Sequence, residues 1–179
     1  MAFFDIPADE ELSPEVRQRL EEYRRLLGLE SLPRTWKVFG RCPKIIEGRF
    51  TAFQNLNYQS RFPWDARNLA VMLIAHAKRC QGCFTGARSQ LNKLGFDEKA
   101  LDGFCANPEV LPLKERDRLF VHYALKIATG SADLHPKDFR EMAEHGFSKE
   151  EAQEIIGFAA YWTMNMVFTQ SVNAALMEE

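Results

Sequence analysis

Residues 65–96 read DARNLAVMLIAHAKRCQGCFTGARSQLNKLGF and predict two consecutive helices. Pro63 opens the first helix, and the apolar run 69–77 forms its body. The helical pattern breaks near Arg79, and a second helix carries the chain to Gly95, a residue type that commonly ends helices. The two predicted helices therefore meet at a pair of cysteines.

This pair is the motif Cys80-Gln81-Gly82-Cys83. Two cysteines at this spacing can close a small disulfide ring, and the thiol of one can hydrogen-bond the thiolate of the other. Such a dithiol can pass on two electrons and two protons. The alternative is that both are small, half-buried apolar residues that happen to lie close together. The spacing alone leaves redox chemistry, metal binding and this structural reading open.

Zinc is the competing use of the cysteines. Cys42 and Cys105 are single, and no histidine lies at a familiar ligand spacing from either of them. His76 could join Cys80 and Cys83 as a third ligand, but no fourth ligand can be identified. We therefore expect no metal and no other cofactor.

The remainder of the chain is also predicted to be helical, because proline, glycine and capping residues punctuate it and no alternating strand pattern occurs. The sequence thus predicts an all-α protein with a single domain, made of an N-terminal helical extension over 1–44 and a core over 45–179. Ser148 and Glu151 form a capping box before the last helix. Further helices are expected at 14–27, 33–39, 44–58, 97–104, 119–130 and 136–146.

The last helix is unusual because residues 155–168 are apolar on almost every face. A surface helix normally has a polar face, so this pattern is typical of a helix buried on all sides. In a domain of this size, one of those sides could be covered by a neighbouring subunit. We therefore expect a homo-oligomer that uses this helix or its neighbours.

Composition limits the functional classes. The chain has 179 residues, 46% of them hydrophobic, and a formal net charge of −2, which gives a sizeable core but no basic face for nucleic acid. Its apolar runs are shorter than the roughly 18 residues of a membrane span, and no basic secretory leader precedes the acidic residues 9–11. A cytoplasmic protein without nucleic-acid or membrane partners is expected, and there a CxxC is more often catalytic than structural.

Charged and basic side chains lie close to the pair in sequence. A reactive thiolate needs positive charge, a helix N-terminus or a nearby base, and Lys78 and Arg79 precede the motif directly. His76 lies one turn before Cys80, so its imidazole can approach that sulfur if the helix stays regular. The structural alternatives are solvated surface charges and a histidine packed in the core. The candidate catalytic residues are Cys83, Cys80 and His76.

The segment 65–96 resembles the core of the alkylhydroperoxidase D-like and carboxymuconolactone decarboxylase superfamily. The layout from Leu113-Lys114-Glu115-Arg116 to the apolar last helix is similar to the C-terminal half of that family, so the resemblance covers the chain from about residue 45 onward. It implies the all-α alkylhydroperoxidase D-like fold. It also implies assembly into dimers, trimers or hexamers.

In the peroxidase branch of this family, the resemblance implies that Cys83 attacks the peroxide and Cys80 resolves the resulting sulfenic acid. That branch also uses a glutamate twelve residues before the first cysteine and a histidine four residues after the second as a proton relay. Here these positions hold Asn68 and Ala87, and neither side chain can exchange a proton near neutral pH. The dithiol is intact, but the usual relay is absent.

The resemblance thus predicts a CxxC-dependent thiol peroxidase or disulfide oxidoreductase that reduces a small hydroperoxide and is regenerated by a dithiol or lipoyl-type reductant. His76 is the best local substitute for the relay, because an unperturbed imidazole has a pKa of about 6.5. One alternative is a family member without peroxidase activity that keeps the pair as a redox sensor or structural element. Another is a decarboxylase-type enzyme on the same scaffold.

Overall fold

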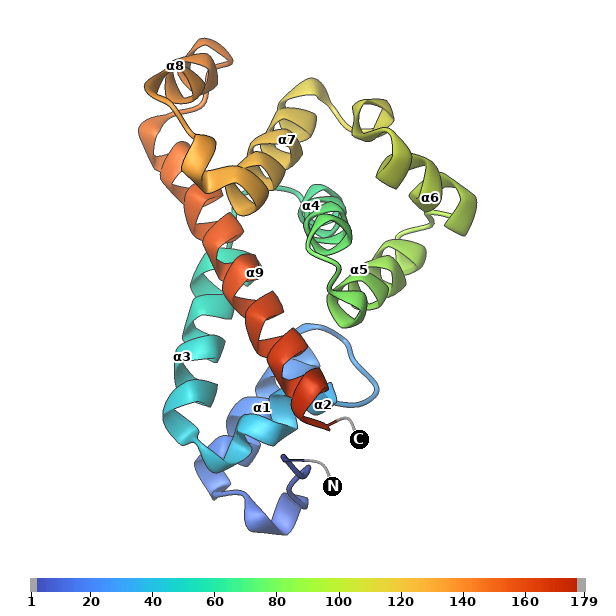
Figure 1. Ribbon diagram of the computed structural model, residues 1–179, viewed down its shortest axis with the longest axis vertical. Coiled ribbons are helices and arrows are strands. Elements are labelled where there is room, and N and C mark those ends of the chain that lie inside the picture. Colours follow the sequence, from blue (N-terminus) through green and yellow to red (C-terminus); the bar gives the residue numbers. More distant parts are fainter. Residues whose placement is uncertain (1–2, 177–179) are drawn as a thin grey trace. The chain divides into compact units, whose positions relative to one another are not determined.

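The computed structural model describes residues 3–176, and every regular element within that range is helical. The predicted all-α class is confirmed. Short 3-10 or π-type turns connect several of the α-helices. The α-helices, shown in Figure 1, are α1 (Pro14–Leu26), α2 (Arg34–Lys37), α3 (Pro43–Phe53), α4 (Trp64–Ala77), α5 (Gln81–Lys93), α6 (Glu98–Ala106), α7 (Glu115–Gly130), α8 (Pro136–Glu144) and α9 (Lys149–Leu176).

The chain forms two compact units. The first comprises Met1–Asn55 together with Val167–Glu179, of which residues 3–55 and 167–176 are described, and the second comprises Leu56–Met166. The predicted boundary between residues 44 and 45 falls at the start of α3, inside the first unit. The cysteine pair belongs entirely to the second unit.

A buried arginine organises the core of the first unit. The guanidinium carbon of Arg49 lies 4.0 Å from the ring centroid of Trp36 and 4.9 Å from that of Phe168. Its Nη1 donates a hydrogen bond of 3.0 Å to the carbonyl oxygen of Thr35. Tyr23 in turn stacks on Trp36, with ring centroids 3.9 Å apart. Aromatic rings and a backbone carbonyl thus contact this buried cation directly.

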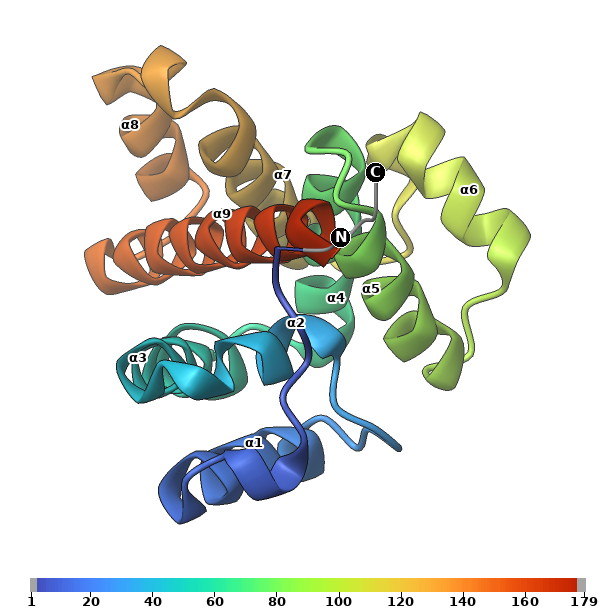
Figure 2. The ribbon, with the colours of Figure 1, turned by 60° about the horizontal axis from the view of Figure 1, so that its bottom comes forward.

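Helix α4 is the central element of the second unit. It packs between α5 and α7, with α6 on the side of α5 and α8 on the side of α7 (Figures 1 and 2). Every residue from Ala66 to Ala75 is buried, so α4 is enclosed on all faces. Phe62, just before the helix, stacks on Phe120 at 4.1 Å between centroids, and Phe120 meets Phe158 edge-on at 5.2 Å.

In the single chain the last helix is not buried on every side. Ile155 and Phe158 of α9 are fully buried, but Ile156 is 38% exposed and Val167 is 58% exposed. Only part of the α9 surface packs against the rest of the chain, although the helix is apolar on almost every face. These exposed apolar residues are where a second copy could bind, and the homo-oligomer stays a prediction.

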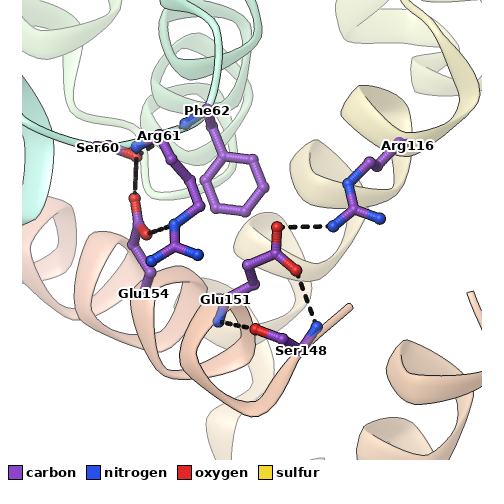
Figure 3. A network of polar contacts seen from close by, with 7 residues as sticks. All are labelled: Ser60, Arg61, Phe62, Arg116, Ser148, Glu151 and Glu154. Carbon is purple, nitrogen blue, oxygen red and sulfur yellow. Dashed lines mark hydrogen bonds and ion pairs between the residues drawn. The ribbon is translucent and has the colours of Figure 1, made fainter. Parts of the chain in front are cut away.

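The segment that leads into α4 is held by a carboxylate on α9. Glu154 accepts hydrogen bonds of 2.7 Å from the hydroxyl of Ser60 and 2.7 Å from the backbone amide of Arg61. The same carboxylate pairs with Nε of Arg61 at 2.5 Å (Figure 3). Because the carboxylate is charged, each of these bonds is stronger than a neutral one. They fix the chain immediately before the enclosed helix.

The predicted capping box at the start of α9 is confirmed. The amide of Ser148 donates to Glu151 at 2.8 Å, and the amide of Glu151 donates to the Ser148 hydroxyl at 3.2 Å. Glu151 also pairs with Arg116 of α7 at 2.6 Å (Figure 3). The N-terminal end of α9 is therefore capped and also linked to α7 by an ion pair.

Candidate dithiol site

Helix α4 ends in a tight turn just before the cysteine pair. The amide of Cys80 donates to the carbonyl of Ala75 at 2.9 Å, and the amide of Arg79 donates to the carbonyl of His76 at 3.1 Å. These two bonds define a Schellman motif, which requires a left-handed residue after the helix. Arg79 is that residue, with φ of 55°. The chain then enters α5 directly at the CxxC motif.

Three other helices of the chain end with the same two hydrogen bonds, and each has glycine in the left-handed position: Gly28, Gly95 and Gly146. Glycine adopts this conformation without steric cost, whereas a residue with a side chain loses about 1–2 kcal/mol. Within residues 3–176, Arg79 is the only residue other than glycine with a positive φ. Backbone strain is therefore located next to the cysteine pair.

Replacing Arg79 with glycine is expected to stabilise the fold. Relief of the left-handed strain is offset in part by the greater freedom of glycine in the unfolded chain, so we expect the free energy of unfolding to rise by about 1 kcal/mol. Equilibrium denaturation of the reduced protein measures this. The matched control is Gly95→Ala, whose φ of 94° predicts a loss instead. An Arg79→Gly variant less stable than the parent would contradict the assignment of strain.

Both cysteines face the packed interior of the second unit. Cys80 is the N-cap residue of α5 and is 1% exposed, while Cys83 lies in the first turn of that helix and is 9% exposed. Cys83, Ala87 and Leu91 recur one turn apart and form the buried face of α5. The structure thus brings the two sulfurs together at a helix start, with Cys83 the more accessible of the two.

The Cys83 thiol lowers the pKa of Cys80 from 9.0 to about 7. Hydrogen bonding of the Cys83 side chain to the Cys80 sulfur is the largest cause, and burial opposes it. The Cys83 amide lowers the pKa further, by less than burial raises it. Two thiols in this relation share one proton, so the pair loses its first proton near neutral pH.

His76 does not have the placement relative to Cys80 that its spacing suggested. The helix ends at Ala77, and the left-handed turn at Arg79 intervenes, so His76 and Cys80 do not occupy successive turns of one helix. His76 is exposed, and its ring lies 5.7 Å from that of Phe84. A role for His76 in proton transfer stays a prediction without the geometric basis assumed for it.

The two relay positions lie in the interior. Asn68 is 7% exposed, and its Nδ2 donates a hydrogen bond of 2.7 Å to the carbonyl of Trp64. Ala87 is 5% exposed. The amide of Asn68 is therefore engaged with its own helix, and the pair lacks a titratable side chain at either position.

The exposed face of α5 carries a shallow groove of about 720 Å³, which the sequence did not predict. Arg88 in this groove lies 5.2 Å from the ring centroid of Phe84 and pairs with Asp102 at 2.6 Å and with Glu98. The only feature of the sequence that could have indicated this groove is the recurrence of polar residues at helical spacing along α5. Neither cysteine lines the groove, whose residues are Gln81, Phe84, Thr85, Arg88, Ser89, Asn92, Lys93 and Glu98.

Two expectations concern metals and membranes. Within the described residues, no group of three histidine, cysteine, aspartate or glutamate side chains is arranged to hold a metal ion. The helices over 3–176 also include none with the length and apolar character that a membrane span requires.

No protein-family profile and no curated protein matches this chain, but solved structures do. A crystal structure of an alkylhydroperoxidase AhpD core, an uncharacterized peroxidase-related protein from Ralstonia eutropha JMP134, superposes with a TM-score of 0.81 at 20% identity, covering 99% of this chain and 92% of the other. The chain has the alkylhydroperoxidase D fold. The predicted resemblance is thereby confirmed at the level of the fold.

Two further structures share this alkylhydroperoxidase D fold. A peroxidase-related protein from Silicibacter sp. TM1040 has a TM-score of 0.78 at 19% identity over 99% of this chain and 92% of its own. A cysteine-to-alanine variant of the debrominase Bmp8, in complex with 2,3,4-tribromopyrrole, has a TM-score of 0.79 at 16% identity. This match covers 97% of this chain and 90% of the debrominase chain. The matches include the N-terminal helices, which lay outside the sequence resemblance.

Proposed function

We propose that the protein is a thiol peroxidase or disulfide oxidoreductase that reduces a small hydroperoxide with Cys80 and Cys83. The observation that carries this proposal is the pKa of about 7 at Cys80, which the Cys83 thiol produces. The thiolate is the nucleophilic form of cysteine, and a pKa near 7 gives a large thiolate fraction at neutral pH. The peroxidase-related proteins that share the fold support the same chemistry.

In the first step, Cys83 attacks because it is the more exposed sulfur. Its proton passes to the Cys80 thiolate, and the Cys83 sulfur then forms a bond to a peroxide oxygen while the oxygen–oxygen bond breaks. The departing alkoxide takes the proton from Cys80 and leaves as an alcohol. The hydrogen bond between the two thiols thus replaces the first part of the missing relay.

In the second step, the Cys80 thiolate attacks the sulfenic acid on Cys83. A disulfide forms, and hydroxide leaves and becomes water with the proton that the pair released on ionising. The dithiol and the hydroperoxide are converted to a disulfide, an alcohol and water, with both electrons supplied by the thiols. A dithiol or lipoyl-type reductant would return the pair to the reduced form by exchange.

Peptide mapping after mild peroxide treatment tests the proposal, together with a peroxide-consumption assay that uses a dithiol donor. One disulfide is expected, between Cys80 and Cys83, and Cys42→Ser and Cys105→Ser should retain activity. Cys105 is a poor competitor because burial raises its pKa. In Cys80→Ser a sulfenic-acid probe should label Cys83. A dominant disulfide through Cys42 or Cys105 would overturn the assignment, and strong labelling of Cys80 in Cys83→Ser would reverse the roles.

We also propose that His76 carries the proton that the pair released on ionising and delivers it to the leaving hydroxide. Its imidazole is solvent-exposed beside Phe84, the residue that follows Cys83. His76→Ala is therefore expected to lower peroxide turnover at least tenfold, a conservative value against the roughly 10²- to 10⁴-fold that a general acid contributes. His122→Ala removes another exposed imidazole, on α7, and should leave turnover unchanged. Steady-state kinetics of the two variants would disprove the role if both equal the parent.

Reductive dehalogenation is a second candidate function, favoured by the structural match to the debrominase Bmp8. A dithiol can supply the two electrons that replace bromine by hydrogen on an aromatic ring, yielding a disulfide and bromide. Bromide release from 2,3,4-tribromopyrrole, measured beside peroxide loss, separates the two activities. A protein that consumes neither compound would instead keep the pair as a redox sensor or structural element.

A further inference from the structure

We propose that Arg79 determines specificity by binding an anionic group, a carboxylate or phosphate, on the molecule that reacts at Cys80 and Cys83. The inference rests on the proposed function only in taking the dithiol as the reactive centre. Its first support is the strained backbone at Arg79, in a position where the chain elsewhere uses glycine. Strain of this kind persists where the side chain serves a function.

The second support is that the Arg79 side chain makes no structural contact in the described chain. It is exposed, and over residues 3–176 its guanidinium makes no hydrogen bond, ion pair or ring contact. Other arginines of the same unit are engaged: Arg88 pairs with Asp102, and Arg116 pairs with Glu151. No contact of the Arg79 side chain within the described chain therefore offsets the free-energy cost of its left-handed backbone conformation.

Lowering the pKa of the neighbouring thiol is also excluded as the role of the Arg79 charge. The lowered pKa of Cys80 comes from the Cys83 thiol and amide, against the effect of burial, and Arg79 is not among its causes. Arg79 is bonded directly to Cys80, so its exposed side chain leaves the backbone one residue from the pair. A guanidinium presents a planar fork that matches carboxylate and phosphate groups.

Alkylation of the reduced pair tests this without any peroxide. Iodoacetate and iodoacetamide are nearly the same size and share a leaving group, but only iodoacetate is anionic. The ratio of their rate constants, measured by mass spectrometry on the peptide that carries both cysteines, is expected to fall about fivefold in Arg79→Gln. Arg79→Lys should keep most of the ratio, and Arg140→Gln, the same charge change at an exposed site on α8, should keep all of it.

The substitutions leave the fold comparable, because glutamine and lysine meet the same left-handed strain as arginine. An unchanged ratio in Arg79→Gln overturns the inference. A lowered ratio in a protein that does not consume peroxide leaves Arg79 as an anion-binding residue and rejects the peroxidase proposal instead. The two failures are therefore distinguishable.

A second pair of comparisons identifies which molecule carries the anionic group. If it is the oxidant, Arg79→Gln should raise the KM for a carboxylate-bearing alkyl hydroperoxide about fivefold and leave the KM for its methyl ester unchanged. If it is the reductant, the same change should appear with dihydrolipoate and not with neutral dihydrolipoamide. If Arg79→Gln changes neither the KM for the carboxylate-bearing hydroperoxide nor the KM for dihydrolipoate, the proposal is contradicted.

Discussion

In a Cys83→Ala variant, the pKa of Cys80 is expected to rise from about 7 to at least its ordinary value of 9.0, because the largest cause of the lowering is removed while burial remains. The thiolate fraction at pH 7 would then fall from about one half to about 1%. The rate of Cys80 alkylation by iodoacetamide, followed from pH 5 to 10, measures the shift. Peroxide turnover should also vanish, since no disulfide can form.

Cys83→Ser is the matched control for this experiment. A serine hydroxyl can still donate a hydrogen bond to the Cys80 sulfur, so part of the pKa lowering should remain although turnover is again lost. A half-maximal rate that stays near pH 7 in Cys83→Ala would show that the lowering has another origin.

The same pKa shift makes the stability of the reduced protein depend on pH. The folded state holds the pKa of Cys80 below its unfolded value of 9.0, so the fold favours the thiolate. The resulting stabilisation is fully present above pH 9 and is lost as pH falls through 7. The reduced parent protein should thus gain stability between pH 7 and 9, a gain that Cys83→Ala lacks.

Asn68→Glu is expected to raise peroxide turnover at least tenfold. It places a carboxylate at the family relay position, and a positioned acid or base contributes about 10² to 10⁴ in rate. Because the site is only 7% exposed, burial would raise the pKa of this carboxyl toward neutrality, which suits proton exchange at pH 7.

The matched control is Asn68→Gln, which has the same length as glutamate but cannot titrate. Equal steady-state turnover in the two variants would show that this position does not relay protons here. Ala87, the second relay position, is a poorer target, because a histidine would overpack a site that is 5% exposed at a cost of about 1–3 kcal/mol.

The helix boundaries could be predicted because the signals that set them are local. Ser13 accepts a hydrogen bond from the amide of Val16, and Asp97 accepts one from the amide of Ala100, as their positions before α1 and α6 predict. The glycine after α5 takes the left-handed conformation that ends it. Each of these interactions lies within a few residues along the chain, so the sequence contains both partners.

The parts of the site that depend on packing could not be predicted in the same way. Counting four residues from His76 to Cys80 assumed a continuous helix, and the left-handed Arg79 interrupts it. Arginine carries no local signal for that conformation, unlike glycine. The composition of α9 likewise did not reveal that Ile156 is exposed, since burial depends on which neighbours cover each face.

The division of the chain has a consequence for the order in which it folds during synthesis. The first unit joins the two ends of the chain: the amide of Phe3 donates to the carbonyl of Ala175 at 3.0 Å, and the rings of Phe39 and Phe168 lie 5.0 Å apart. The ribosome delivers Leu56–Met166 before the segment that completes this unit. The dithiol unit is therefore expected to pack first, and the first unit is expected to pack only when residues 167–176 are available to it.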